Sequence, residues 1–443
     1  MTRCILTALL SLTMLACTRA PAEHDGRVTI TFMLWGRPNE LHSLQDALTN
    51  EFERANPDIH VELLPVAGNL YQTKLATMLA AGMAPDVFAV HEAFLPMAVQ
   101  NKLIMPLDEL VAADTELDLN EFFPEVVTQC FYRGHQYKLP VSVNLVMLYY
   151  NKDAFDQTGL PYPDKTWKWD RMRDAALALT RRNERGQITR YGIDGPGSRW
   201  LFYLLFMWQN GGELFDAHDH LVIGRPEYLD ANTQALEFMR NLVCVDHVSP
   251  YLSEAEVTPA NPFLSGERAM SMSGTWLNSQ ILTTWRELVR RGATNEMPRW
   301  GITHLPWEQR RATFIFGGSP VISSMCPCPE KAWRVITFFL SDTWQRHLAT
   351  DGREIPAKKS VAFSNLYLKQ DGIPADVDLS VIFDALPYAR PQPQGPEVAE
   401  VMEKEITELR DRLLSGDLMA VRPALIKLQE AADSECPYCT RRR

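Results

Sequence analysis

Hydrophobic positions in the first hundred residues follow two alternating repeats. The segment 28–34 has an apolar residue at every second position, which predicts a strand. The segment 41–55 has apolar residues three or four positions apart, which predicts a helix. Further elements follow in the same alternation: strands at 59–63 and 86–90, and helices at 75–82 and 95–99. This β–α–β–α–β order predicts a parallel, doubly wound sheet that binds ligands at the carboxyl ends of its strands.

The run LPVSVNLVMLYYNKDAF, residues 139–155, breaks its own apolar pattern once. Asn144 stands in a segment that otherwise predicts a buried strand. An unpaired buried polar group costs about 1–3 kcal/mol, so the amide has a partner, either within the sheet or in a ligand. A helix is predicted to begin at Asn151-Lys152-Asp153, directly after the strand.

The second half of the chain contains one strongly apolar block and two glycine-containing segments. Residues 200–208 predict a buried helix, because Trp200, Tyr203 and Trp208 share one helical face. The segment FLSGERAMSMSGTW, residues 263–276, predicts a strand that ends in Gly274-Thr275-Trp276. Residues 300–323 predict two strands with Gly317-Gly318, which either approaches a ligand or forms a bulge. Helices are predicted after Thr166-Trp167 and at 232–242, 329–340, 398–414 and 420–432.

Several segments together resemble one family, the extracellular solute-binding proteins of the sugar class of bacterial ABC transporters (family 1). The resemblance includes the crossover run 139–155 and the segment APDVFAVHEAFLPMAVQNKLIMPLDEL at 84–110. It continues with the Gly-Thr-Trp strand end, with GREIPAKKSVA at 352–362 and with FDALPYARPQP at 383–393. No one motif is diagnostic, but their order and spacing match from about Val28 to Ala432.

The resemblance implies an α/β, two-lobed periplasmic-binding-protein fold. Each lobe is expected to be a mixed, mostly parallel sheet flanked by helices, and a multi-strand hinge joins the lobes. The hinge crossings are expected near 140–144, 314–319 and 362–368. The expected first lobe is 28–140 with 320–362, and the expected second lobe is 141–319 with 363–443.

The resemblance also implies a ligand cleft. Sugars present apolar C–H faces and hydroxyl rims, so their sites combine flat aromatic rings with amides, carboxylates and guanidinium groups. The cleft loops supply both kinds of group. Trp35, Trp276 and Tyr388 are candidates for stacking. The candidates for hydrogen bonding are the side chains of Arg37, Glu92, Asn144 and Arg353 and the backbone at Gly318.

The N-terminal sequence indicates export. Residues 1–17 contain Arg3, an apolar run from Ile5 to Ala16, and then Cys17. The run is shorter than the roughly 20 residues of a membrane span, but it suits a signal peptide. We interpret 1–17 as a lipoprotein signal with Cys17 as the lipidated residue and 18–27 as a tether. A plain secretory signal is the alternative.

Composition excludes some classes of function. The formal net charge of −11 argues against nucleic acid as a partner, because phosphate binding needs a basic surface. Apolar residues make up 46% of the chain, and the mean hydropathy is −0.19, as in a globular protein. Cys436 and Cys439 form a C-x-x-C near the end of the chain, where a local disulfide or free thiols are expected. We predict no metal site and no cofactor.

These observations predict a monomeric binding protein on the outer side of a membrane. It would deliver a sugar or oligosaccharide to an ABC permease and its ATPase, held to the membrane by a lipid at Cys17. The chain lacks common enzyme motifs such as H-E-x-x-H, G-x-S-x-G and the P-loop, so no catalysis is expected. The alternatives are a carbohydrate-active enzyme that uses two carboxylates and a sugar receptor that feeds a membrane sensor. Glycerol phosphate remains open as the ligand.

Overall fold

The computed structural model describes residues 21–435, with the exception of 37–40, 91–93, 196–199, 217, 252–260, 353, 394–397, 399–400 and 416–419. By its internal contacts the chain divides into two compact units. Unit 1 comprises Met1–Phe88, Leu103–Met105 and Ile322–Val335, and unit 2 comprises Ala89–Lys102, Pro106–Val321 and Ile336–Arg443. The boundaries of the two lobes expected from the sequence stay a prediction.

Parallel strands form the centre of unit 1. Strand β2 (Arg27–Trp35) pairs in parallel with β3 (Ile59–Val66) and with β4 (Val87–Val90). The predicted doubly wound β–α–β–α–β order is therefore confirmed. The helices between these strands are α1 (His42–Ala47), η2 (Leu48–Phe52), α2 (Glu53–Ala55) and α3 (Gly68–Ala80). Helix α4 (Leu95–Gln100) follows β4 and belongs to unit 2. The sheet also contains β1 (Ala22–His24), which lies in the segment predicted as a tether, and β13 (Ser319–Ile322).

A buried carboxylate connects β2 to the start of β4. One oxygen of Asp86 accepts hydrogen bonds from the backbone N–H of Thr31 at 2.9 Å and from the Thr31 hydroxyl at 2.7 Å. Asp86 is buried, and a buried charge is tolerated only when hydrogen bonds replace its lost hydration. The Asp-Val start of the strand thus fixes the position of β4 beside β2.

One long strand organises unit 2. Strand β7 (Ser142–Asn151) is buried along its whole length. Four strands pair with it antiparallel: β10 (Met270–Gly274), β11 (Trp300–Thr303), β12 (Thr313–Phe316) and β14 (Ile355–Pro356). Strand β15 (Ala389–Arg390) adds a parallel pair to β12. The sheet is mixed, as predicted. Four strands return antiparallel against β7, so these four run in the same direction as one another, and β15 runs parallel to them.

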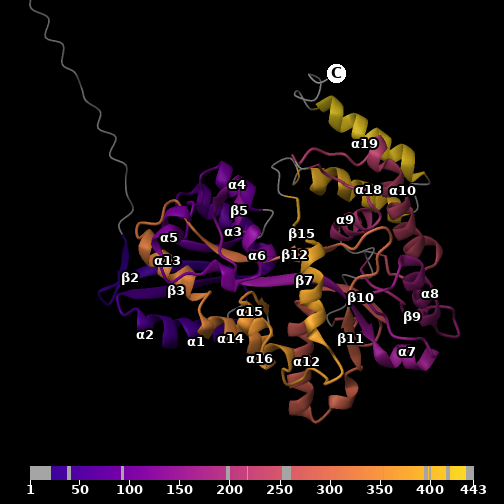
Figure 1. The fold of residues 1–443 in the computed structure, drawn as a ribbon, viewed down its shortest axis with the longest axis horizontal. Helices are drawn as coiled ribbons and strands as arrows, with labels where there is room; N and C mark the ends of the chain where they lie inside the picture. The colour runs from indigo at the N-terminus through magenta and orange to yellow at the C-terminus, as the bar shows by residue number, and fades with distance from the viewer. Residues whose placement is uncertain are drawn as a thin grey trace, which may run out of the picture. The chain divides into compact units, whose positions relative to one another are not determined.

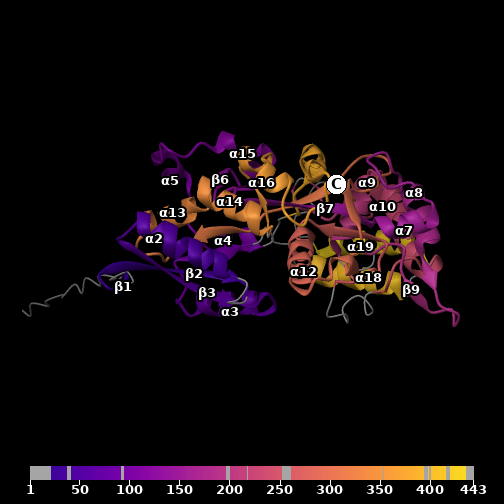
Figure 2. The same ribbon diagram turned by 90° about the horizontal axis from the view of Figure 1, so that it is seen from below.

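Helices gather against this sheet in both views (Figures 1 and 2). Among them are α8 (Trp169–Leu179), α9 (Trp200–Gln209), α10 (Pro226–Arg240), α18 (Thr407–Leu414) and α19 (Val421–Glu435). Tyr203 and Trp208 of α9 are buried in the core, which confirms their predicted role. Helix α10 begins six residues before the predicted residue 232, because Pro226 suits the first helical position. The third expected hinge crossing, 362–368, lies in the short helices α15 (Lys359–Ala362) and α16 (Asn365–Leu368) and not in a strand.

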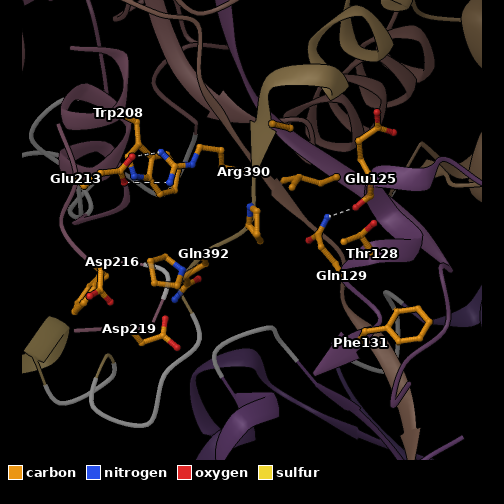
Figure 3. A pocket seen from close by; sticks show the side chains of 15 residues that line it. Glu125, Thr128, Gln129, Phe131, Trp208, Glu213, Asp216, Asp219, Arg390 and Gln392 are labelled. Atoms are coloured by element: carbon orange, nitrogen blue, oxygen red, sulfur yellow. Dashed lines mark hydrogen bonds and ion pairs between the residues drawn. The ribbon is translucent and has the colours of Figure 1, made fainter. Parts of the chain in front are cut away.

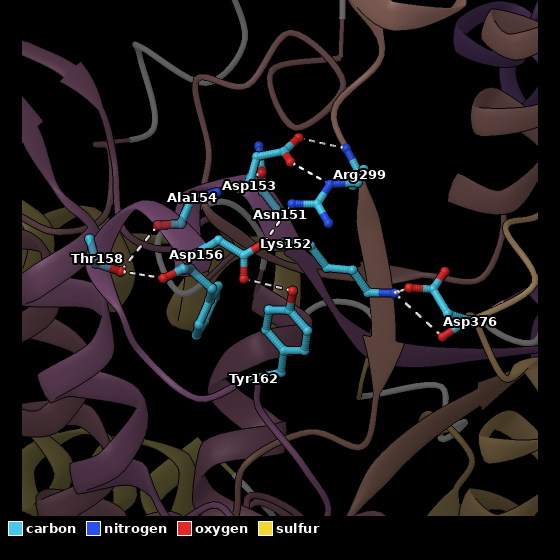
Figure 4. Close-up of polar contacts among 10 residues, drawn as sticks. Asn151, Lys152, Asp153, Ala154, Asp156, Thr158, Tyr162, Arg299 and Asp376 are labelled. Atoms are coloured by element: carbon cyan, nitrogen blue, oxygen red, sulfur yellow. Dashed lines mark hydrogen bonds and ion pairs between the residues drawn. The ribbon is translucent and has the colours of Figure 1, made fainter.

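Polar contacts fix the helix that follows β7, as Figure 4 shows. Helix α7 (Lys152–Thr158) begins where predicted, because the Asn151 side chain accepts a hydrogen bond from the Ala154 N–H at 3.0 Å. The Lys152 side chain is only 5% exposed, and its ammonium group lies 2.6 Å from the carboxylate of Asp376. Arg299 bonds Asp153 on the same helix at 2.7 Å. These pairs attach two distant segments of the chain to the end of the central strand.

Within the described residues, no helix is both long and apolar enough to cross a bilayer. The predicted signal peptide 1–17 and its Cys17, together with the Cys436–Cys439 motif, lie outside the described residues.

Candidate functional site

Asn144 has a hydrogen-bond partner within the chain, which is one of the two possibilities that the sequence left open. Its side-chain oxygen accepts a hydrogen bond from the Thr275 hydroxyl at 3.0 Å, and the residue is 6% exposed. The Thr275 hydroxyl also accepts from the Leu145 backbone N–H at 3.2 Å. The Nδ2 group of Asn144 has no hydrogen-bond partner in the described part of the chain. One half of the amide is therefore structural, and the donor half is available to a ligand.

Trp276 follows β10 and stands at the start of α12 (Leu277–Arg291). Its ring lies against Gly274, so closely that a Cβ atom on that glycine would be 2.0 Å from a ring carbon. The ring also meets the edge of Phe316, with 5.8 Å between the ring centroids. Trp276 is partly exposed. A glycine thus makes room for a tryptophan that rests on the strand end without being enclosed by the core.

Strand pairing brings these groups together. In the antiparallel register, Gly274 lies opposite Val146, and Phe316 lies opposite Asn144. We call Asn144, Thr275, Trp276 and Phe316 the Trp276 cluster. Gly318 follows Phe316 by two residues and is partly exposed. Three predicted site residues, Asn144, Trp276 and Gly318, therefore come from adjacent strand ends.

Tyr388 has other neighbours. Its hydroxyl is hydrogen-bonded to Nδ1 of His304, and the Arg311 guanidinium lies 5.9 Å from its ring centroid. Burial raises the pKa of Tyr388 to about 12, so the hydroxyl stays protonated. Within the described residues, no hydrogen bond or ring contact joins Tyr388 to the Trp276 cluster.

The remaining candidates lie in unit 1 or outside the described residues. Trp35 ends β2 in unit 1, where its ring meets the edge of Tyr71 at 5.4 Å. Arg37, Glu92 and Arg353 lie outside the described residues. Thr275 and Phe316 were missed as site residues, because one reads as a strand end and the other as a strand interior. The only signal for Thr275 was a hydroxyl residue directly after the strand's last glycine.

A separate cavity of about 490 Å³ lies in unit 2, and none of the predicted site residues lines it. Figure 3 shows Arg390 beside Trp208 on one wall and Glu125 with Gln129 on another. The Arg390 guanidinium lies 4.1 Å from the centroid of the Trp208 ring. It also forms two hydrogen bonds to the carboxylate of Glu213, at 2.8 and 3.0 Å. This cavity was not foreseen from the sequence, because its walls come from distant segments.

Among the described residues, no group of three metal-ligating side chains is close enough to hold an ion. The His218-Asp219-His220 segment instead forms a turn in which Asp216 accepts hydrogen bonds from the backbone N–H groups of His218 and His220. The groups that the Trp276 cluster could offer to a ligand are the face of an aromatic ring, an amide N–H donor and the nearby backbone at Gly318.

The fold belongs to a class of binding proteins with known structures. It matches an ABC substrate-binding protein of Listeria monocytogenes, solved in complex with cycloalternan, with a TM-score of 0.78 and 24% identity over 92% of this chain and 98% of that one. It matches the sugar-binding protein MalE of Xanthomonas citri with a TM-score of 0.72 and 22% identity over 92% of this chain and 97% of that one. The predicted two-lobed binding-protein fold is thus confirmed.

The family model for bacterial extracellular solute-binding proteins matches residues 47–375. The chain belongs to this family, which confirms the resemblance found in the sequence and implies an extracytoplasmic location. One relative is the sn-glycerol-3-phosphate-binding periplasmic protein UgpB of Salmonella typhimurium. It is 34% identical over 139 residues, which cover 29% of this chain and 31% of that protein.

Proposed function

We propose that this chain is the ligand-binding component of an ABC importer and that it binds a sugar or oligosaccharide at the Trp276 cluster. One observation carries the proposal. Trp276 is held by Gly274 as a partly exposed flat ring, next to an amide whose Nδ2 group has no partner within the described residues. A ring that covers the apolar face of a sugar and an amide that binds its hydroxyl are complementary to that ligand.

Similar proteins support the class of ligand. The Listeria monocytogenes protein was solved with cycloalternan, and a solute-binding protein of Thermotoga lettingae was solved with α-D-tagatose. In the proposed cycle, the lobes close over the sugar about the strands near 140–144 and 314–319, and a membrane permease with its ATPase accepts the loaded form. The proposed attachment is a lipid on Cys17, which would keep the protein close to its permease.

Calorimetric titration tests the proposal directly. Full-length protein would be titrated with maltose, maltotriose, cycloalternan and tagatose, and with glycerol 3-phosphate as the charged alternative. We expect one of the sugars to bind with micromolar affinity, about −8 kcal/mol. Binding of glycerol 3-phosphate alone would contradict the sugar assignment while keeping the transport class.

Recovery of the ligand separates binding from catalysis. An oligosaccharide that binds should be returned at unchanged chain length after prolonged incubation, as chromatography of the released sugar would show. Shortened products that appear with protein concentration would favour the alternative of a carbohydrate-active enzyme.

A further inference from the structure

A short hairpin that follows helix α8 carries an excess of positive charge. Strand β8 (Arg181–Arg182) pairs antiparallel with β9 (Ile188–Arg190). The segment 181–190, RRNERGQITR, contains four arginines and a single carboxylate, that of Glu184, in a chain whose formal net charge is −11. We call this segment the arginine hairpin. Positive charge that is gathered at one place on an acidic protein attracts anions to that place.

The turn of the arginine hairpin is held by its own hydrogen bonds. The side-chain oxygen of Asn183 accepts hydrogen bonds from the backbone N–H groups of Arg185 and Gln187, both at 3.0 Å. The backbone N–H of Asn183 donates to the carbonyl oxygen of Gln187 at 2.9 Å. These bonds join the two strands, and in their register Arg181 lies directly opposite Arg190.

This pairing brings two like charges together. Side chains that lie opposite each other in an antiparallel pair share one face of the sheet, and like charges in these positions repel each other. Burial and the charge of Arg181 both lower the pKa of Arg190, yet a guanidinium group keeps its proton at neutral pH. Within the described residues, neither arginine forms an ion pair with a carboxylate. The protein therefore holds two neighbouring positive charges that no carboxylate of the described residues balances.

Acceptors of the protein bind only some of the N–H donors of this pair. At the end of α8, the carbonyl of Leu179 accepts from Nε of Arg190 at 3.2 Å, and the carbonyl of Ala178 accepts from Nη1 of Arg181 at 3.3 Å. Such carbonyls carry only a partial negative charge, so they orient the guanidinium groups without neutralising them. Nη2 of Arg190 is buried and has no hydrogen-bond partner in the described part of the chain. Because buried donors are usually paired, Nη2 indicates an acceptor from outside the protein.

We propose that the arginine hairpin is a binding site for a phosphate group. The planar fork of a guanidinium group matches two oxygens of a tetrahedral oxyanion, and a phosphate dianion balances the charges of both Arg181 and Arg190. Nη2 of Arg190 would donate to one oxygen, and the exposed side chain of Arg181 would donate to another. Inorganic phosphate and the headgroup of an anionic phospholipid present this same group, and the phospholipid would bring the hairpin to a membrane surface. Neither arginine belongs to the Trp276 cluster, so the site is independent of the proposed sugar binding.

Calorimetric titration of the full-length protein with inorganic phosphate at low ionic strength tests the free anion. We expect saturable binding that weakens as sodium chloride is added, because salt screens the attraction between charges. Arg190→Gln and Arg181→Gln should each weaken the binding by about tenfold or more, as expected for one lost charge-assisted hydrogen bond. Arg346→Gln is the matched control, because it removes an exposed arginine from the distant helix α14 (Asp342–Asp351), and it should bind phosphate like wild type.

Sedimentation with vesicles tests the phospholipid as the source of the phosphate group. The same variants would be mixed with vesicles of phosphatidylglycerol and, as the control without net charge, of phosphatidylcholine. If the headgroup is the ligand, wild type and Arg346→Gln should sediment with phosphatidylglycerol several-fold more than Arg190→Gln and Arg181→Gln do. The N-terminal segment is the same in every variant, so it cannot cause a difference between them.

Binding of either probe that is lost in both hairpin variants and kept in Arg346→Gln supports the site. The proposal is overturned if neither probe binds saturably or if all variants bind alike. An equal loss in Arg346→Gln would also overturn it, because it would show diffuse attraction to positive charge. Since Arg181 is exposed, Arg181→Gln still tests the site if Arg190→Gln fails to fold. Trp276→Ala should keep its affinity for phosphate, whereas a loss would place the phosphate at the Trp276 cluster.

Discussion

Trp276 and Trp208 lie in the same unit and are linked by a short row of rings, yet their surroundings differ. Trp276 meets Phe316 at 5.8 Å, Phe316 stacks on Phe314 at 5.6 Å, and Phe314 meets Trp208 at 4.7 Å. Trp276 is partly exposed at one end of this row, whereas Trp208 is only 2% exposed at the other. The same side chain is thus offered to solvent in one place and enclosed in the other.

The neighbours of the two rings explain the difference. Trp276 has a glycine beneath it, so its ring rests on the backbone of a strand end. Trp208 is packed between Phe314 and the Arg390 guanidinium, and its carbonyl accepts a hydrogen bond from Arg310 at 2.6 Å. The size and charge of the contacting residues decide whether a tryptophan is available for stacking on a ligand or serves the core.

Replacement of the enclosed ring should have the largest effect on stability. Trp208→Ala would leave a cavity in the core of unit 2, and we expect a loss of about 3–5 kcal/mol in the free energy of unfolding. Chemical denaturation followed by circular dichroism measures the loss. A change under about 1 kcal/mol would mean that Trp208 is no more of a core residue than Trp276.

The addition of a side chain at Gly274, beneath the exposed ring, should have the next largest effect on stability. Gly274→Ala places a Cβ where the Trp276 ring lies, so the ring must move, at a cost of about 1–3 kcal/mol in stability. Because the displaced ring no longer rests on the strand, sugar affinity should also fall. Gly68→Ala is the matched control, since a Cβ there meets nothing within 4 Å. Unchanged affinity in Gly274→Ala would mean that the position of Trp276 does not matter for binding.

Local patterns in the sequence predicted part of the fold and part of the candidate site. The alternating repeats predicted the parallel strands of unit 1, and the break at Asn144 predicted a paired amide, because both features are local. The strand end at Trp276 was also predicted. The close approach of its ring to Gly274 was not predicted, because it depends on the three-dimensional packing of the strand end.

Contacts between distant segments account for most of what was missed. His304 and Tyr388, which are 84 positions apart, form a hydrogen-bonded pair. Glu213 and Arg390, which are 177 positions apart, form one wall of the cavity beside Trp208. No repeat or motif in the sequence indicates such pairs, because the packing of the whole unit determines which distant residues meet.

Loss of the hydroxyl that holds Asn144 should have a moderate effect. Thr275→Val keeps the shape of the side chain but leaves the Leu145 N–H and the Asn144 oxygen without this partner. We expect the free energy of unfolding to fall by about 1–2 kcal/mol and sugar binding to weaken with it. Thr275→Ser keeps the hydroxyl and should restore most of the affinity. If serine and valine behave alike, the hydroxyl does not position Asn144.

The smallest expected effect is a pH dependence of stability that arises from His304, the hydrogen-bond partner of Tyr388. Burial and the nearby Arg311 charge lower the pKa of His304 below its ordinary value near 6.5, so the folded protein favours the neutral ring. The unfolded chain then binds more protons than the folded one between the two pKa values. The stability is therefore complete above pH 6.5 and falls as the pH drops toward the lowered pKa. His304→Gln should flatten this part of the profile measured by denaturation, and an equally steep profile would assign the dependence to other groups.

The central claim is that Trp276 binds ligand whereas Trp208 supports the fold, and one pair of measurements on Trp276→Ala tests it most directly. Affinity for the sugar identified by titration and the free energy of unfolding of the empty protein would be measured on the same preparation. We predict a loss of about 2–4 kcal/mol in binding, roughly thirty-fold or more in affinity, with little change in stability. A loss of about 3–5 kcal/mol in stability with unchanged affinity of the folded fraction would contradict the claim and place Trp276 in the core.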